Sequence, residues 1–248
     1  MTPAQALRAA RRVVVLTGAG VSAESGIATF RDAQTGLWER FAAEDLATPG
    51  AFRRDPDLVW GWYEWRRMQV LRARPNAAHR AVAALAAKVP ALSVVTQNVD
   101  DLHERAGSRG VVHLHGSLHA PRCSACDEPF ALPPEAPREP DGGRRLAPPR
   151  CARCGAAVRP GVVWFGESLP AQAWNEAEEA VADCELLLAI GTSGLVHPAA
   201  SLPALARGHG ATVLVINPVP TGLDALAQHV LRGTAGELLP ALLETAFG

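Results

Sequence analysis

The chain has 248 residues, of which 48% are hydrophobic, and a formal net charge of −1 at pH 7. This length can bury a sizeable core, in one large domain or in a large domain with a small insert. The near-neutral charge argues against specific nucleic-acid binding and against an anionic membrane surface. No apolar run is as long as a membrane span, and residues 1–12 lack the apolar core of a signal peptide, so we expect a cytoplasmic protein.

Short apolar runs alternate with helical patterns along most of the chain. In chain order, the sequence predicts a helix over 3–10, a strand over 13–16, a tryptophan-rich helix over 58–67, a helix over 76–88, a strand over 92–96, a helix over 98–107, a strand over 111–116, a helix over 171–182, a strand over 186–190, a helix over 198–207, a strand over 211–216 and a helix over 237–246. This alternation predicts an α/β fold, a Rossmann-like parallel sheet with helices on both faces.

A glycine turn follows the first predicted strand. Gly18-Ala19-Gly20 opens a short polar turn, and backbone N–H groups at such a place can receive a phosphate. The pattern alone is weak, because a tight strand-to-helix turn looks the same. No second strand with an acidic end follows it, which argues against an ordinary hydride-transfer dehydrogenase.

Several polar or glycine residues lie where predicted strands end. In a parallel sheet, ligands bind at the carboxyl ends of the strands. We therefore expect one ligand site to be formed by Gly18, Gln97, His115, Gly191 and Asn217.

Four of the five cysteines form two pairs with two-residue spacing, Cys123 with Cys126 and Cys151 with Cys154. Four thiolates complete the tetrahedral shell of one Zn²⁺ and leave no position for a catalytic water, so the pattern predicts a structural zinc site. The surrounding segment is rich in proline, arginine and glycine. We interpret 118–160 as a small zinc-binding module inserted into a Rossmann-like domain formed by 1–117 and 161–248.

Three groups of side chains have a functional and a structural interpretation. His115 could take a proton from a ribose hydroxyl or could be a structural histidine. Asn98 could hydrogen-bond a nicotinamide or a ribose, or cap a helix. Tyr63 and Arg66 share a helix face and could bind a carboxylate, or could belong to an aromatic helix with an exposed arginine. The residues alone leave these alternatives open.

In its motifs the chain resembles the sirtuins, which are NAD-dependent protein-lysine deacylases. The motifs occur in order over nearly the whole chain, at 18–31, 96–100, 114–116, the paired cysteines, 163–167 and 191–193. Residues 45–49 and the pair Tyr63 and Arg66 resemble the class III branch, whose members prefer acidic acyl groups such as succinyl and malonyl.

The resemblance implies that acyl-lysine proteins or peptides bind in a cleft beside NAD, with His115 as general base and Asn98 as a second catalytic residue. Tyr63 and Arg66 would hold the acyl carboxylate, and Val162, Val163, Trp164 and Phe165 would pair with the peptide backbone. The residues expected to bind NAD are Gly18, Ala19, Gly20, Glu24, Thr29, Phe30, Arg31, Gln97, Asn98, Asp100, Gly191, Thr192, Ser193, Asn217 and Ala235. We expect a monomer.

Two positions depart from the family pattern. Ala28 stands where the family usually has proline, and Val219 stands near where an acidic residue often helps to hold the adenosine ribose. A plain deacetylase, an ADP-ribosyltransferase and, from another class, a zinc-ribbon interaction protein are the alternatives. The last would use the arginines of the cysteine-containing segment to bind nucleic acid.

Overall fold

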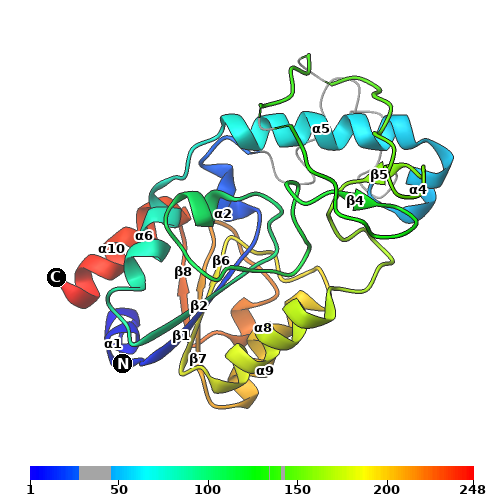
Figure 1. Ribbon diagram of the computed structural model, residues 1–248. Helices are drawn as coiled ribbons and strands as arrows, with labels where there is room; N and C mark the ends of the chain where they lie inside the picture. Colours follow the sequence, from blue (N-terminus) through cyan, green and yellow to red (C-terminus); the bar gives the residue numbers. More distant parts are fainter. Residues whose placement is uncertain (28–45, 134, 141–142) are drawn as a thin grey trace.

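The computed structural model describes residues 1–27, 46–133, 135–140 and 143–248. These residues form a six-stranded sheet in the order β3-β2-β1-β6-β7-β8, in which every neighbouring pair is parallel (Figure 1). Its strands are β1 (Arg12–Thr17), β2 (Ala91–Thr96), β3 (Val112–His113), β6 (Leu186–Ile190), β7 (Thr212–Ile216) and β8 (His229–Leu231). The strand order reverses between β1 and β6, where an open parallel sheet leaves a crevice for a ligand.

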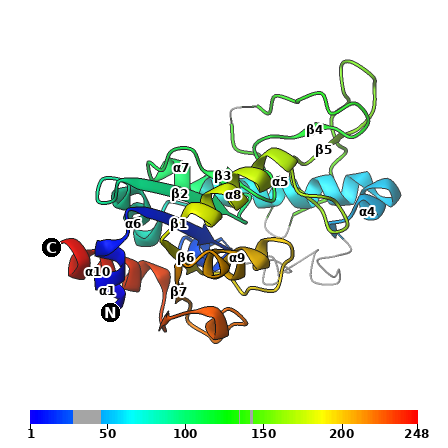
Figure 2. The same ribbon diagram turned by 90° about the horizontal axis from the view of Figure 1, so that it is seen from below.

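Helices cover both faces of this sheet, which confirms the predicted α/β architecture (Figure 2). One face packs against α1 (Pro3–Ala9), α6 (Ala77–Leu85) and α10 (Ala235–Phe247), and the other against α8 (Ala171–Asp183) and α9 (Leu202–Gly208).

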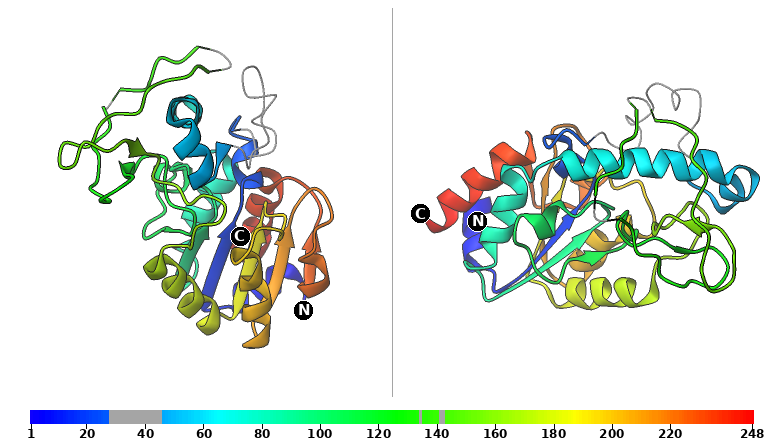
Figure 3. Two further views of the ribbon diagram at one scale, coloured as in Figure 1. Left: turned by 90° about the vertical axis from the view of Figure 1, so that its right-hand side faces the viewer. Right: turned by 45° about the horizontal axis from the view of Figure 1, so that its top comes forward.

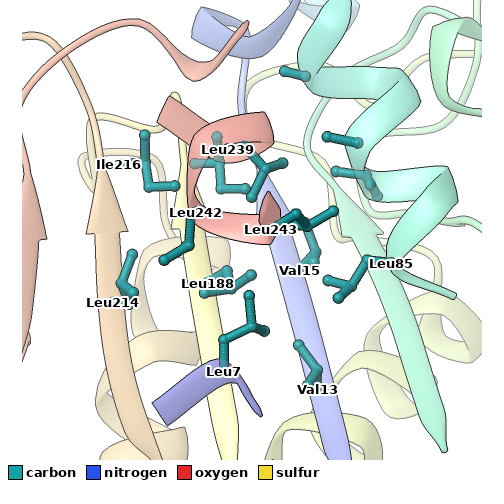
Figure 4. Packing of buried hydrophobic residues seen from close by; sticks show 14 of the residues in the cluster. Leu7, Val13, Val15, Leu85, Leu188, Leu214, Ile216, Leu239, Leu242 and Leu243 are labelled. Carbon is teal, nitrogen blue, oxygen red and sulfur yellow. The ribbon is translucent and has the colours of Figure 1, made fainter. Parts of the chain in front are cut away.

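Alternating strand residues build the two cores. Val13 and Val15 point toward Leu7 and Leu239 on one face, as Figure 4 shows, while Val14 belongs to the core on the opposite face. A strand buried on both faces needs apolar side chains at consecutive positions, which explains the unbroken apolar runs in the sequence.

A third core lies outside the sheet, around α4 (Pro49–Arg54) and α5 (Pro56–Arg72). Asp55 caps α5 by accepting from the Leu58 N–H at 3.1 Å. Three tryptophans of α5 are buried, which explains why this helix has no single apolar stripe. At 17 residues α5 is the longest described helix, and none of the described helices is long and apolar enough to span a membrane.

The cysteine-containing segment forms its own antiparallel two-stranded sheet, of β4 (Arg122–Cys123) and β5 (Val158–Arg159). Figure 1 places this sheet beside α4 and α5, away from the six-stranded sheet. A loop of the same segment also contacts α5 directly, since the Leu146 N–H donates to the Asp57 carbonyl at 2.9 Å.

Besides α4, β4 and β5, which the sequence did not predict, the structure differs from the expected elements in three places. The strand expected over 111–116 covers only Val112–His113, because the chain then turns toward Gly116, whose φ is +73°. The helix expected over 98–107 is shortened to α7 (Leu102–Arg105), since residues before Leu102 take part in other hydrogen bonds. Strand β8 was not expected, because three residues are too short to display a period.

Candidate active site

The glycine turn packs directly on the loop after β6, and this contact explains its glycines. The Gly20 N–H donates to the Gly191 carbonyl at 2.9 Å. A Cβ on Gly18 would lie 2.8 Å from the same oxygen, and Gly191 itself has a φ of +60°. The glycines at these positions thus allow two strand ends to approach at the crevice of the sheet.

Side chains link the other strand ends. The Gln97 amide, after β2, donates to the Thr192 hydroxyl, after β6, at 2.9 Å. Asn217, after β7, is buried and donates to the Val219 carbonyl at 2.8 Å. Ser193, which follows Thr192, is exposed. The strand ends expected to form one ligand site therefore lie along one edge of the sheet.

The start of α10 joins this edge. Ala235 is the first residue of the helix, and the N–H of the following Gly236 donates to a Glu24 carboxylate oxygen at 2.8 Å. A carboxylate at a helix N-terminus is favourable because it faces the positive end of the helix dipole. Glu24 thereby fixes the position of the glycine turn relative to α10, while Ala19 of that turn is exposed.

His115 lies two positions beyond β3, in a turn. Its Nδ1 lies 3.0 Å from the backbone carbonyl of Gln97. Burial lowers the pKa of His115, and the contact with Gln97 only partly opposes this. His115 is therefore neutral at neutral pH, which is the state in which an imidazole can accept a proton.

A buried hydrogen-bond network lies beside His115, with the Ser22 hydroxyl at its centre. Asn98 donates to this hydroxyl at 3.1 Å, and the hydroxyl donates to an Asp100 carboxylate oxygen at 3.0 Å. Burial raises the pKa of Asp100, while hydrogen bonds from Leu102 and Ser22 lower it. Asn98 does not cap α7, so the capping interpretation is wrong, while its role at the nicotinamide or ribose stays a prediction.

The network continues into two histidines that sequence reasoning did not select. His79 Nε2 lies 3.4 Å from the Ser22 hydroxyl, and the His79 and His103 rings are 4.9 Å apart. His103 Nε2 in turn contacts the Thr17 hydroxyl at 3.0 Å. Both histidines are fully buried, and in the sequence both resemble ordinary helix residues, so no pattern distinguishes them.

Tyr63 and Arg66 occupy consecutive turns of α5. Tyr63 is buried, and its hydroxyl accepts from the Trp164 Nε1–H at 3.1 Å. Burial lowers the pKa of Arg66, while the nearby Tyr63 and Asp100 raise it. The guanidinium carbon of Arg66 lies 5.2 Å from the centre of the Trp62 ring. The next residue, Arg67, forms a buried ion pair with Glu64 at 2.8 Å.

The 162–165 segment passes between His115 and α5. The Val163 N–H donates to the His115 carbonyl, and the Phe165 N–H donates to the Ala47 carbonyl, both at 2.9 Å. Trp164 is buried, whereas Phe165 is 43% exposed. Because these amides already have acceptors, a peptide pairing with this segment would use its carbonyl groups.

The four paired cysteines come together as a metal site. Their Sγ atoms all lie within 4.8 Å of one another, with contacts of 3.4 to 3.8 Å between Cys123 and Cys154, Cys126 and Cys154, and Cys126 and Cys151. Tetrahedral Zn²⁺ with bonds of about 2.3 Å requires sulfur separations of about 3.8 Å. The site fits one zinc ion with four thiolate ligands.

Among the expected site residues, Thr29, Phe30 and Arg31 lie outside the residues that the structure describes, as does Ala28. Val219 is described, and it is 59% exposed. The adjacent loop is held by Arg232, which donates to the Val219 carbonyl at 3.2 Å and pairs with Asp224. Val219 is therefore exposed on a loop that Arg232 holds.

Known proteins resemble this chain over nearly its whole length. The model of the Sir2 family matches residues 18–198. A protein of Methylococcus capsulatus named NAD-dependent protein deacylase is 64% identical over 238 residues, which cover 96% of this chain and 93% of the relative. A Pseudomonas aeruginosa protein named NAD-dependent protein deacylase 1 is 60% identical over 243 residues, with 97% and 96% covered.

Solved structures of Sir2 proteins also superpose on nearly the whole chain. A crystal structure of a Sir2 homologue in complex with NAD superposes with a TM-score of 0.90 at 46% identity, covering 98% of this chain and 92% of the other. A structure of Sir2 bound to acetylated peptide superposes with a TM-score of 0.82 at 28% identity, covering 97% and 95%.

Proposed function

The chain belongs to the Sir2 family of sirtuins, and we propose that it is an NAD-dependent protein deacylase that removes succinyl and malonyl groups from lysine side chains, and acetyl groups as well. NAD serves as co-substrate: its nicotinamide leaves and its ribose receives the acyl group. The protein's own residues then have to bind NAD at the strand ends, hold the acyl-lysine and move one proton.

His115 is the group proposed to move that proton. It stands beyond β3, next to the Asn98, Ser22 and Asp100 network, and it is neutral at neutral pH. It can therefore accept the proton of a ribose hydroxyl, which becomes the nucleophile. Asn98 would orient the ribose or an ordered water, since its side-chain amide is fixed by the Ser22 hydroxyl.

The proposed acyl preference is supported by the position of Tyr63, one turn from Arg66 on α5, with its hydroxyl against Trp164 of the 162–165 segment. Arg66 lies over the Trp62 ring, with 5.2 Å between its guanidinium carbon and the ring centre, and the Tyr63 hydroxyl accepts from Trp164 at 3.1 Å. A guanidinium and a phenol in a partly buried position bind a carboxylate well, because desolvation strengthens charged hydrogen bonds. Arg67 cannot take this role, since Glu64 neutralises it.

The four cysteines would hold zinc as a structural ion, because four thiolates complete its coordination. The alternative of a nucleic-acid-binding zinc ribbon is not favoured. Five of the seven arginines of this segment already pair with carboxylates, namely Arg122, Arg144, Arg145, Arg153 and Arg159. A cytoplasmic location and a monomeric state stay predictions of the sequence.

One peptide carrying acetyl-, malonyl- or succinyl-lysine tests the proposal. With NAD, the wild-type protein should release nicotinamide and the matching O-acyl-ADP-ribose, identified by mass spectrometry, with the largest kcat/KM for the acidic acyl groups. A kcat/KM that is larger for acetyl-lysine would support a plain deacetylase. Transfer of ADP-ribose to protein without loss of the acyl group would support an ADP-ribosyltransferase.

A further inference from the structure

Arg159, at the end of β5, has an unusual set of contacts for an arginine near a zinc-binding sheet. It is only 9% exposed. Its guanidinium donates to both carboxylate oxygens of Glu167, at 2.5 and 2.8 Å, and to the Val162 carbonyl at 3.1 Å. These contacts tie β5 to both ends of the segment 162–167. Figure 3 shows β4 and β5 beside α5 in the view on its right.

The same ion pair holds the Trp164 ring. The guanidinium carbon of Arg159 lies 3.6 Å from the centre of that ring, which is the distance of a stacked cation–π contact. The backbone N–H of Trp164 donates to a carboxylate oxygen of Glu167 at 2.9 Å. Arg159 and Glu167 therefore fix both the backbone and the ring of Trp164.

Trp164 in turn determines how Tyr63 can hydrogen-bond. An indole N–H is only a donor, so the 3.1 Å contact makes the Tyr63 oxygen an acceptor. The hydroxyl hydrogen must then point away from Trp164. A hydroxyl that accepts a hydrogen bond is also a better donor, because hydrogen bonds in a chain polarise one another.

We propose that Arg159 is a positioning residue for acyl selectivity: by holding Trp164 with Glu167, it directs the Tyr63 hydroxyl hydrogen toward the carboxylate of the acyl group. This inference rests on the proposed role of Tyr63 and Arg66 as the carboxylate receptor. We do not expect Arg159 itself to contact NAD or the acyl group. Its effect should therefore appear in the preference among acyl groups.

The first test is the ratio of kcat/KM for succinyl-lysine to kcat/KM for acetyl-lysine peptide. Arg159→Met should lower this ratio by about tenfold through a higher KM for the succinyl peptide, since about 1.4 kcal/mol of a charged hydrogen bond corresponds to tenfold. Trp164→Phe, which keeps a ring but removes the N–H, should lower it in the same direction. Arg153→Met removes an exposed arginine of the same segment, paired with Glu128, and should leave the ratio unchanged.

The second test does not depend on enzymatic activity. Tyr63 is the only tyrosine, so protein labelled with ¹³Cζ-tyrosine gives one NMR signal from the ring carbon that carries the hydroxyl. Arg159→Met and Trp164→Phe should shift this signal, and Arg153→Met should not. Zinc content and thermal unfolding of each variant show whether the protein is folded.

A double variant separates a direct effect from one through Tyr63. In a Tyr63→Phe background, Arg159→Met should lower the ratio no further, because the hydroxyl through which it acts is gone. Two results for Arg159→Met would overturn the inference: an unchanged ratio, or equal losses of kcat/KM for both acyl groups with an unshifted tyrosine signal. If Arg66→Met still lowers the ratio, the carboxylate receptor itself would stand. An unchanged ratio in Arg66→Met would contradict the carboxylate receptor itself, and the inference with it.

Discussion

The backbone carbonyl of Gln97 lies 3.0 Å from Nδ1 of His115 and fixes the tautomer of that ring. A carbonyl only accepts hydrogen bonds, so Nδ1 carries the proton and Nε2 has the free lone pair. The hydrogen bond to the Gln97 carbonyl thereby leaves Nε2 as the basic nitrogen of His115.

This arrangement predicts the acid limb of the pH profile. The base works only when neutral, so kcat/KM should rise with pH and level off above the pKa of His115. Because burial lowers that pKa, the midpoint should lie below 6.5. His115→Gln should lose at least about 100-fold in kcat. A midpoint above 6.5, or a variant with wild-type kcat, would contradict the assignment.

A second pH effect concerns stability. Burial lowers the pKa of His103 to about 4, although the charge of Glu104 opposes this, and burial with the charges of His103 and Arg80 lowers the pKa of His79 to about 3. An unfolded histidine titrates near 6.5. The unfolded state therefore binds more protons below pH 6.5. The stabilisation is fully present above 6.5 and is lost as pH falls from 6.5 toward 4, by at most about 1.4 kcal/mol per pH unit for each histidine.

Urea unfolding at pH 7 and pH 5 measures this loss. His103→Gln should reduce the dependence of unfolding free energy on pH, although it destabilises the protein at pH 7. His209→Gln, at an exposed site, should keep the wild-type dependence. Equal slopes in all three proteins would show that His103 is not the titrating group.

Gly61 of α5 marks a close backbone contact. A Cβ at this position would overlap the carbonyl oxygen of Arg144, on the loop that crosses the helix. Gly61→Ala should therefore destabilise the protein by about 1–3 kcal/mol, despite the better helix propensity of alanine. Gly208→Ala, at a helical glycine with nothing within 4 Å, should be neutral or slightly stabilising. Similar changes in melting temperature for both variants would contradict the close contact.

Removal of zinc should destabilise the cysteine-containing segment. Four thiolates bound to zinc would hold β4 and its neighbouring turns, and the only sheet in the described part of the segment is a pair of two-residue strands. A chelator or Cys126→Ser should lower the melting temperature and the zinc content together. Cys184→Ser, away from the cluster, should retain one zinc per chain. Metal-free protein with an unchanged melting temperature would argue against a structural ion.

Much of the fold was predictable because it depends on short-range patterns. The buried strands are unbroken apolar runs, and the zinc ligands have a fixed two-residue spacing. Because Gly18, Gln97 and Gly191 follow predicted parallel strands, their position at one edge of the sheet was also predictable.

Contacts between distant residues had no such signal. Trp164 and Tyr63 are 101 positions apart, and only the fold brings them together. The same holds for Ser22 and His79, 57 positions apart. The shortened strand at His115 also depends on a tertiary feature, the antiparallel bridge of Gly116 to Val162.

The most direct test of the account compares succinyl-lysine with acetyl-lysine on one peptide, at saturating NAD, in the wild-type protein, Arg66→Met and Arg72→Met. Arg72 is exposed at the end of the same helix and serves as the matched control. We expect the wild-type protein to prefer succinyl-lysine in kcat/KM. This preference should fall by about tenfold or more in Arg66→Met, because a charged hydrogen bond to the carboxylate is removed, and it should be retained in Arg72→Met. A preference for acetyl-lysine in the wild type, or equal losses for both peptides in Arg66→Met, would contradict it.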